Sequence, residues 1–435
     1  MNDREAIRPD WRLIVCGLAV LSLTSVTHLA LFRKDTEFRY PDSTTYFMPA
    51  EQMLLGNGFA DAPGIPDTIR TPGYPAFLAV CRFLGLNDRQ IVLVQHGVCI
   101  AFSLVIIIAG VVLTRSRLAA TTAGLIYAID PTTLRYSNLL LTESLFTILL
   151  FLIVFLTARA LSEGDTRRVA VIGILSGLLS ILRPAALFYP FVLLFILMVR
   201  TRQRRARIAA VFLASAAIVP FAWMSRNAVQ TGVFVFCSIS GTNLLMHRAA
   251  GALAMEDGGD FAANLTRHQN ELLAPAQERL RQRYGVAAFM LPHAVQGREY
   301  GKEARPVILE HLPAYARLTI RGLGENLFSD DAETLTSLND SALDDGDITS
   351  VVRFYTGTLL VLALAGGALL SRKEAQLAML LIGTIFYFVL IAAGAEAESR
   401  FRAPVVPQMA LLAGLAVASA AGRARRLIRL QPIDL

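Results

Sequence analysis

The stretch YPDSTTYFMPAEQMLLGNGFADAPGIPDTIRTPGYP, residues 40–75, follows the first strongly apolar segment of the chain. It holds acids, one arginine, prolines and glycines, and no run of about 20 apolar residues that would cross a bilayer. After Asp42, the side chains of Tyr46, Ala50 and Leu54 fall on one face of a helix. The spacing predicts an amphipathic helix that lies along the membrane surface and ends at the glycines that follow.

The composition around this stretch is that of a membrane protein with many spans. The chain has 435 residues, 54% of them hydrophobic, and a mean hydropathy of +0.51. This is too apolar for a soluble domain and too long for a single anchor. The net charge of +7 comes from arginines clustered between apolar runs, which argues against a nucleic-acid partner. The four scattered cysteines predict neither a disulfide framework nor a zinc site.

About ten apolar segments are candidate membrane spans. They are residues 11–32, 89–114, 118–136, 139–161, 169–183, 184–199, 208–225, 353–371, 376–394 and 404–422. We read the first of these as a span that is kept rather than as a cleaved leader. Every second connection carries arginine or lysine, which predicts that both termini lie in the cytoplasm.

The run VAVIGILSGLLSILRPAALFYPFVLLFILMV, residues 169–199, is long for one crossing and short for two. A single crossing would place the arginine cluster that follows on the wrong side of the membrane. We therefore expect a short helical hairpin that turns at Arg183 and Pro184, since proline ends a helix readily.

This topology divides the chain into three parts. Residues 1–225 form an N-terminal bundle that contains the first outer loop, 33–88. Residues 226–352 form a mostly helical extracytoplasmic subdomain, and residues 353–435 form the last spans and a basic cytoplasmic tail. The expected fold class is an all-α polytopic membrane protein, with interfacial helices in the first outer loop.

Within the second outer loop, two stretches have helical patterns, near 264–284 and 299–328. An acidic stretch, DDAETLTSLNDSALDDGD, follows at 330–347 and is expected to be flexible.

Motifs along the chain resemble one known family. Asp42, Tyr46, Ala50 and Gly56 form the series D-x3-Y-x3-A-x5-G, and R-x-PGYPAFL follows from Arg70. Further landmarks are TESLF (142–146), LRP (182–184), W-x2-RN (223–227), SGTNLL (240–245), ILEHLPAY (308–315) and SRFRAPVVPQMALLAG (399–414). Their order is similar to that in the GT-C superfamily of polyprenyl-phosphate-sugar-dependent glycosyltransferases. The branch resembled is that of the bacterial relatives of protein O-mannosyltransferases and of lipid A aminoarabinose transferases.

The resemblance implies an inverting transfer of a sugar from a polyprenyl-phosphate carrier to an acceptor hydroxyl. The acceptor would be lipid A, a cell-surface glycan or a protein, at the periplasmic face of a bacterial inner membrane. The family's loop aspartate, which activates the acceptor, corresponds to Asp42. The simpler interpretation of Asp42 is a helix cap, because its side chain can accept from free backbone amides.

Arginines at the outer ends of the spans are candidates to hold the carrier phosphate, since guanidinium groups bind phosphate with two donors. They are Arg70, Arg183, Arg226, Arg400 and Arg402. For each, the alternative is pairing with an acid or with lipid headgroups. The relatives begin the loop motif Asp-Glu and place an arginine before the tyrosine, whereas this chain has Ser43 and Thr45. Arg70 is expected to supply the missing charge.

Glu143 is a second catalytic candidate, although an acid at a helix start also suits the helix dipole. Tyr46 either lines the sugar pocket or sits at the interface, and Tyr74 fixes the return of the RTPGYP turn to the membrane. Asp42 and Glu143 can together hold a divalent cation, but we expect no obligatory metal or other cofactor.

A transporter or flippase for polyprenyl lipids or glycolipids is the alternative function. It predicts inverted halves and ionisable groups near the midplane of the membrane. The expected partners in either case are the lipid-linked sugar and membrane lipids, with no nucleic acid.

Overall fold

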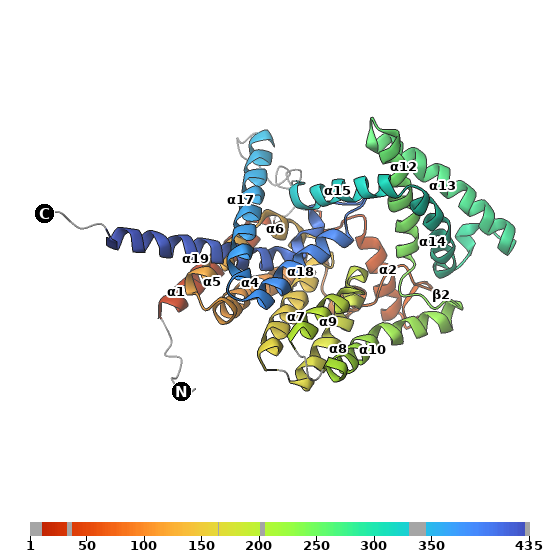
Figure 1. Ribbon diagram of the computed structural model, residues 1–435. Coiled ribbons are helices and arrows are strands. Elements are labelled where there is room, and N and C mark those ends of the chain that lie inside the picture. The colour runs from red at the N-terminus through yellow and green to blue at the C-terminus, as the bar shows by residue number, and fades with distance from the viewer. Residues whose placement is uncertain (1–10, 33–36, 164, 201–204, 330–344, 431–435) are drawn as a thin grey trace.

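The computed structural model describes residues 11–32, 37–163, 165–200, 205–329 and 345–430. The N-terminal basic residues and residues 330–344 of the acidic stretch lie outside this described part. Nearly all of the described chain is helical (Figure 1). The first half contains α1 (Trp11–Leu31), α2 (Ser43–Leu54), α3 (Gly73–Phe83), α4 (Asp88–Thr114), α5 (Arg117–Ile129), α6 (Pro131–Ser137), α7 (Glu143–Glu163), α8 (Thr166–Leu182), η1 (Pro184–Ala186), α9 (Tyr189–Arg200) and α10 (Arg205–Thr231).

The second half begins with a group of helices packed around its own small core. They are α11 (Ile239–Asn243), η2 (Leu244–Ala249), α12 (Ala250–Asp257), α13 (Phe261–Tyr284), η3 (Ala288–Met290), α14 (His293–Glu310) and α15 (Leu312–Phe328). We call these helices the α11–α15 subdomain. The chain then returns to the bundle through α17 (Asp345–Ser371), α18 (Ala375–Ile391), η4 (Ser399–Phe401), η5 (Ala403–Val405) and α19 (Val406–Leu430).

The protein is a polytopic membrane protein of almost entirely helical structure. Each of the ten predicted apolar segments is helical, although not every one is a single helix. Among the described residues, six helices are long and apolar enough to cross a membrane, namely Trp11–Ala30, Asp88–Thr114, Glu143–Leu161, Arg205–Thr231, Gly346–Ser371 and Ser399–Ala424. Shorter apolar helices lie at Arg117–Ile129, Pro184–Val199 and Ala375–Ile391. The break at Arg183 and Pro184 is confirmed, because α8 ends at Leu182 and η1 begins at Pro184.

Several helix boundaries differ from those expected from the sequence, for reasons of local chemistry. The segment 118–136 is two helices, because Asp130 caps α6 through Thr133 and Pro131 occupies its first position. The stretch 299–328 is likewise divided at His311, where α14 ends and α15 begins. Two short antiparallel strands, β1 (Ala60–Ala62) and β2 (Ile65–Pro66), were not predicted.

The RTPGYP stretch is not only a turn, since α3 begins at Gly73. A Cβ atom on Gly73 would lie 2.6 Å from the carbonyl oxygen of Ile181. The missing side chain therefore lets α3 pack directly against the end of α8, next to Arg183. This contact brings the first loop of the chain to the break between α8 and α9.

Candidate active site

Asp42 lies at the N-cap position of α2, as its place in the motif predicts. Side-chain capping is nevertheless wrong, because the carboxylate makes no hydrogen bond to the helix amides. Its Oδ1 accepts from Arg70 Nη2 at 2.7 Å, and its Oδ2 accepts from Arg400 Nη1 at 2.7 Å. Both carboxylate oxygens are thus bound to guanidinium groups from distant parts of the chain.

Glu143 is the first residue of α7 and is bound to two arginines, one of which also binds Asp42. Its Oε1 accepts from Arg183 Nη1 at 3.0 Å and also from Arg400 Nε. Arg400 therefore bridges the two carboxylates. The break after α8 presents Arg183, and the short η4 segment before α19 presents Arg400.

These five side chains, Asp42, Arg70, Glu143, Arg183 and Arg400, are called the ionic cluster below. It contains three guanidinium groups and two carboxylates, so its formal charge is positive and suits an anion. Burial differs sharply between the two acids, since the side chain of Asp42 is 34% exposed and that of Glu143 is 2% exposed. Asp42 is consequently the acid that a substrate can reach.

Ser43 and Thr45, which follow Asp42 in the loop motif, both hold the ionic cluster in place. Ser43 Oγ accepts from the Tyr40 amide and donates to the Leu140 carbonyl, which fixes the start of α2. Thr45 Oγ1 donates to the Asp42 carbonyl and accepts from Arg70 Nε at 2.8 Å. Thr45 thereby orients Arg70, which supplies the charge that the motif lacks at this point.

Tyr46 and Tyr74 form a buried aromatic pair beside the ionic cluster. The guanidinium of Arg70 lies over the Tyr46 ring, 4.8 Å from its centroid. The Tyr74 ring meets that of Tyr46 edge to face at 5.2 Å, and the Tyr74 hydroxyl donates to Gln95. Tyr46 therefore supports a site residue directly, whereas Tyr74 anchors α3 to α4.

Arg226 and Arg402 are not brought to the ionic cluster, contrary to the sequence-based grouping. Arg226 donates to the carbonyls of Phe59 and Asp67 and so holds the β1–β2 region against α10. Arg402 is almost fully buried and donates to Thr132 Oγ1 and to the Leu327 carbonyl. Sequence alone gave these two arginines the same membrane-edge position as the others, so it could not separate them.

Two residues at the edge of the ionic cluster were missed by the sequence analysis. The Tyr40 hydroxyl donates to Glu398 at 3.1 Å, and the guanidinium of Arg400 lies over the Tyr40 ring. Burial raises the pKa of Glu398, although Arg400 acts in the opposite direction. The available signal was position, because Tyr40 and Glu398 each precede a site residue by two places.

The electrostatic environment keeps Asp42 ionised. Burial alone would raise the pKa of this carboxyl, but Arg70 and Arg400 outweigh burial and hold its pKa below the usual value. The carboxylate is therefore present at neutral pH and ready to accept a proton. With both guanidinium groups bound, however, it is a weak base.

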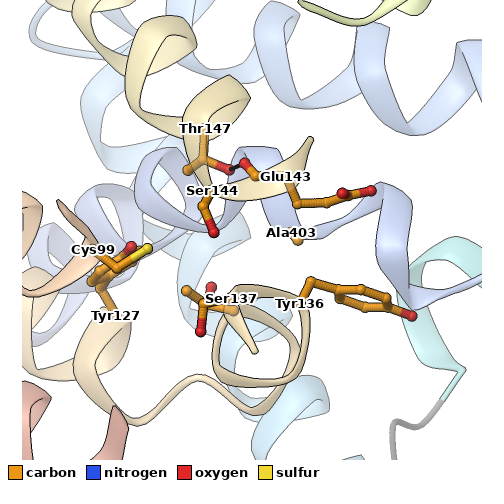
Figure 2. Close-up of a pocket in the computed structure, with 9 residues that line it drawn as sticks. Cys99, Tyr127, Tyr136, Ser137, Glu143, Ser144, Thr147 and Ala403 are labelled. Carbon is orange, nitrogen blue, oxygen red and sulfur yellow. Dashed lines mark hydrogen bonds between the residues drawn. The ribbon is translucent and has the colours of Figure 1, made fainter. Parts of the chain in front are cut away.

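A small buried cavity lies behind Glu143 (Figure 2). Hydroxyl groups of Ser137, Ser144 and Thr147 line it, and Thr147 Oγ1 donates to the backbone carbonyl of Glu143. The cavity is far too small for a sugar and includes neither Asp42 nor an arginine. It belongs to the supporting structure beneath the site.

Within the described ranges, no group of three or more His, Cys, Asp or Glu side chains is placed to hold a metal ion. Asp42 and Glu143, the pair considered for a divalent cation, are both bound to Arg400. A guanidinium group thus occupies the position between them.

No protein-family model matches the chain, and no curated protein matches it in sequence. Solved structures do match. The oligosaccharyltransferase AglB from Archaeoglobus fulgidus, in complex with an inhibitory peptide and a dolichol-phosphate, superimposes with a TM-score of 0.54 at 12% identity. The alignment covers 98% of this chain and 53% of AglB, so the chain spans about half the length of that protein.

A second structure of the same enzyme, tethered to an acceptor peptide with the NVT sequon, gives a TM-score of 0.54 at 13% identity, over 96% of this chain and 51% of AglB. ArnT from Cupriavidus metallidurans, bound to undecaprenyl phosphate, gives 0.42 at 12% identity, over 97% of this chain and 81% of ArnT. The ArnT score is too low to support an assignment. The AglB match over nearly the whole chain shows that this protein shares the fold of the matched half of AglB.

Proposed function

We propose that the protein is an inverting glycosyltransferase that moves a sugar from a polyprenyl-phosphate carrier to an acceptor hydroxyl. One observation carries the proposal. Asp42, a reachable carboxylate, shares one ionic cluster with three arginines that come from the first loop, the α8–α9 break and the η4 segment before α19. A base and an anion-binding group are both needed for this reaction, and the ionic cluster contains both.

In the proposed step, Asp42 accepts the proton of the acceptor hydroxyl while that oxygen attacks the anomeric carbon of the sugar. The bond between the anomeric carbon and the carrier phosphate oxygen breaks, and its electron pair leaves with the phosphate. The products are the glycosylated acceptor with inverted anomeric configuration and the polyprenyl phosphate. The leaving phosphate needs no proton, so one acid is sufficient, unlike the pair of acids in glycoside hydrolysis.

Arg70, Arg183 and Arg400 hold the carrier phosphate in this scheme. Arg70 and Arg400 also bind the two oxygens of Asp42, so phosphate and carboxylate compete for the same donors. Binding of the donor draws guanidinium charge away from Asp42, which raises the pKa of its carboxyl and makes it a better base. The reaction is therefore ordered, with the donor bound before the acceptor is activated.

Glu143 acts as a positioning residue in this proposal rather than as an acid or base. It is too buried to meet the acceptor, and it holds Arg183 and Arg400 on one oxygen. A divalent cation has no part in the scheme, because Arg400 already bridges the two carboxylates. We place the site at the periplasmic face of a bacterial inner membrane and both termini in the cytoplasm, on the support of the arginine distribution.

The direct test uses the purified protein in nanodiscs with a polyprenyl-phosphate donor radiolabelled in its sugar. Transfer of label from the lipid to a hydroxyl acceptor, with release of polyprenyl phosphate, supports the proposal. The transporter alternative is tested in parallel with proteoliposomes. Movement of intact donor across the bilayer without cleavage would overturn the transferase function.

A further inference from the structure

We propose that an apolar tip, formed where the end of α10 meets the α11–α15 subdomain, inserts into the membrane leaflet on the side of Asp42. The tip consists of Val229 in the last turn of α10, Phe234 just beyond that helix, and Phe289 and Met290 in η3. Each of these four side chains is at least half exposed. Scattered apolar side chains are common on protein surfaces, but a group of four drawn from two segments marks an interaction surface.

The tip is continuous with a surface that faces lipid. Phe221 and Ile218 are exposed on α10, which is one of the helices able to cross the membrane. The ring of Phe221 contacts the ring of Phe234, with centroids 5.7 Å apart. The apolar face of α10 therefore extends without a break into the tip. Because α10 is long and apolar enough to cross a membrane, bilayer lipid is the partner that fits this face.

The two halves of the tip are fixed to each other. Val233, Ala294 and Val295 form a small buried cluster, against which Tyr284 and Leu291 also pack. These residues flank Phe234 on one side and Phe289 and Met290 on the other. Figure 1 shows the end of α10 next to β2 and α14, below the subdomain. The tip is thus one surface rather than two separate loops.

The length of α10 sets the depth of the tip. Its 27 residues span about 40 Å, whereas the hydrocarbon core is about 30 Å thick. The end of the helix therefore reaches the headgroup region. Arg283 and Arg298 flank the tip, and both donate to Glu299. Arginines beside aromatic and apolar side chains are typical of segments that lie in this interface.

Membrane contact at the tip bears on the proposed active site. The Ser238 amide donates to the Thr68 carbonyl at 2.7 Å, two residues before Arg70. Gly297 of α14 packs on Ser238 so closely that a Cβ there would lie 2.3 Å from the Ser238 carbonyl oxygen. The subdomain that carries the tip therefore also holds the loop that carries Arg70. Only this consequence rests on the proposed function; the membrane contact does not.

The test places a nitroxide label at Phe289→Cys in the full chain, reconstituted singly in nanodiscs of phosphatidylethanolamine and phosphatidylglycerol. Cys16→Ser removes the least buried native cysteine, and the parent without an added cysteine gives the background. Power-saturation EPR then compares collisions with oxygen, which is enriched in lipid, and with nickel-EDDA, which stays in water. Asn270→Cys, on an exposed polar position of α13, is the matched control.

We expect oxygen collisions to exceed nickel-EDDA collisions at Phe289→Cys and the reverse at Asn270→Cys. Val229→Cys provides a second reporter on the other segment of the tip, should the Phe289→Cys chain fail to fold. A label at both tip positions that meets nickel-EDDA as freely as the control would overturn the proposal. Exclusion of both reagents would also overturn it, because the tip would then be covered by protein.

Discussion

Arg400 Nη1 lies 2.7 Å from Asp42 Oδ2, although 358 positions separate the two residues in the chain. The same guanidinium also donates to Glu143, which begins a third segment. One arginine of η4 thus connects the first loop, the start of α7 and the segment that leads into α19. Burying such a group is unfavourable unless its partners are placed well, so this contact constrains the whole bundle.

Arg70 and Arg226 are a matched pair for testing the phosphate site, because both lie near the first loop and only Arg70 contacts Asp42. Arg70→Ala should weaken the binding of undecaprenyl phosphate by roughly 10 to 100-fold, the effect of losing a charged hydrogen bond of about 1.5–3 kcal/mol. Arg226→Ala should leave this affinity close to that of the wild type. Equal losses in the two variants would remove Arg70 from the phosphate site.

Glu143 is expected to be a structural requirement of the ionic cluster. Glu143→Ala leaves Arg183 without its carboxylate partner and Arg400 with only Asp42. Removing one partner of a buried ion pair costs about 3–5 kcal/mol. Glu143→Gln should recover part of the loss, because its amide oxygen still accepts from a guanidinium. Thermal unfolding in micelles should rank the wild type above Gln, and Gln above Ala. An unfolding temperature unchanged in the Ala variant would contradict this role.

Asp67 predicts a pH dependence of stability. Its pKa is raised to about 6, chiefly by burial and in smaller part by the Asp61 charge, while the Ile69 amide, Arg226 and Arg70 act in the opposite direction. For an acid whose pKa is higher in the folded state, the folded protein binds the proton more strongly. Stability therefore falls as pH rises from about 4, the unfolded value, to about 6, and the loss is complete above that.

Asp67→Asn removes this ionisation and keeps an oxygen to accept from the Ile69 amide. The variant should unfold at a higher temperature than the wild type at pH 7.5, and the difference should shrink toward pH 4. Asp61→Asn should lower the pKa of Asp67 and weaken the pH dependence, since the Asp61 charge acts in the same direction as burial. A difference that grows as the pH falls would refute the sign of this effect.

Sequence reasoning recovered the helices and the break at Arg183, because apolar period and proline act locally. It placed Asp42 at the start of α2 and left open both a helix cap and a catalytic base, since it could not see the two arginines that bind the carboxylate. The division of the segment 118–136 is marked in the sequence by an Asp-Pro pair at Pro131. Hydropathy averaged over the whole apolar run hides this pair.

Local sequence did not predict which arginines join the ionic cluster. Arg400 and Arg402 are two residues apart, yet one joins the ionic cluster and the other donates to Thr132 and Leu327. Backbone direction within η4 and η5 decides between them, and this depends on packing from distant helices. Hydropathy and residue spacing carry no information on which of the two arginines joins the ionic cluster. The boundaries of the three predicted parts of the chain, and the orientation of its termini, stay predictions.

The central claim is that Asp42 is the base and that the arginines around it hold the carrier phosphate. Asp42→Asn tests both parts in one preparation, by measuring sugar transfer and the binding of undecaprenyl phosphate. Asp88→Asn, which breaks a separate ion pair with Arg39 and Arg82, is the control and should keep transfer.

We predict that Asp42→Asn lowers turnover by about 10²–10⁴-fold, the usual contribution of a general base. It should bind undecaprenyl phosphate at least as tightly as the wild type, because Arg70 and Arg400 no longer face a competing carboxylate. Full turnover in the Asp42→Asn protein would contradict the account.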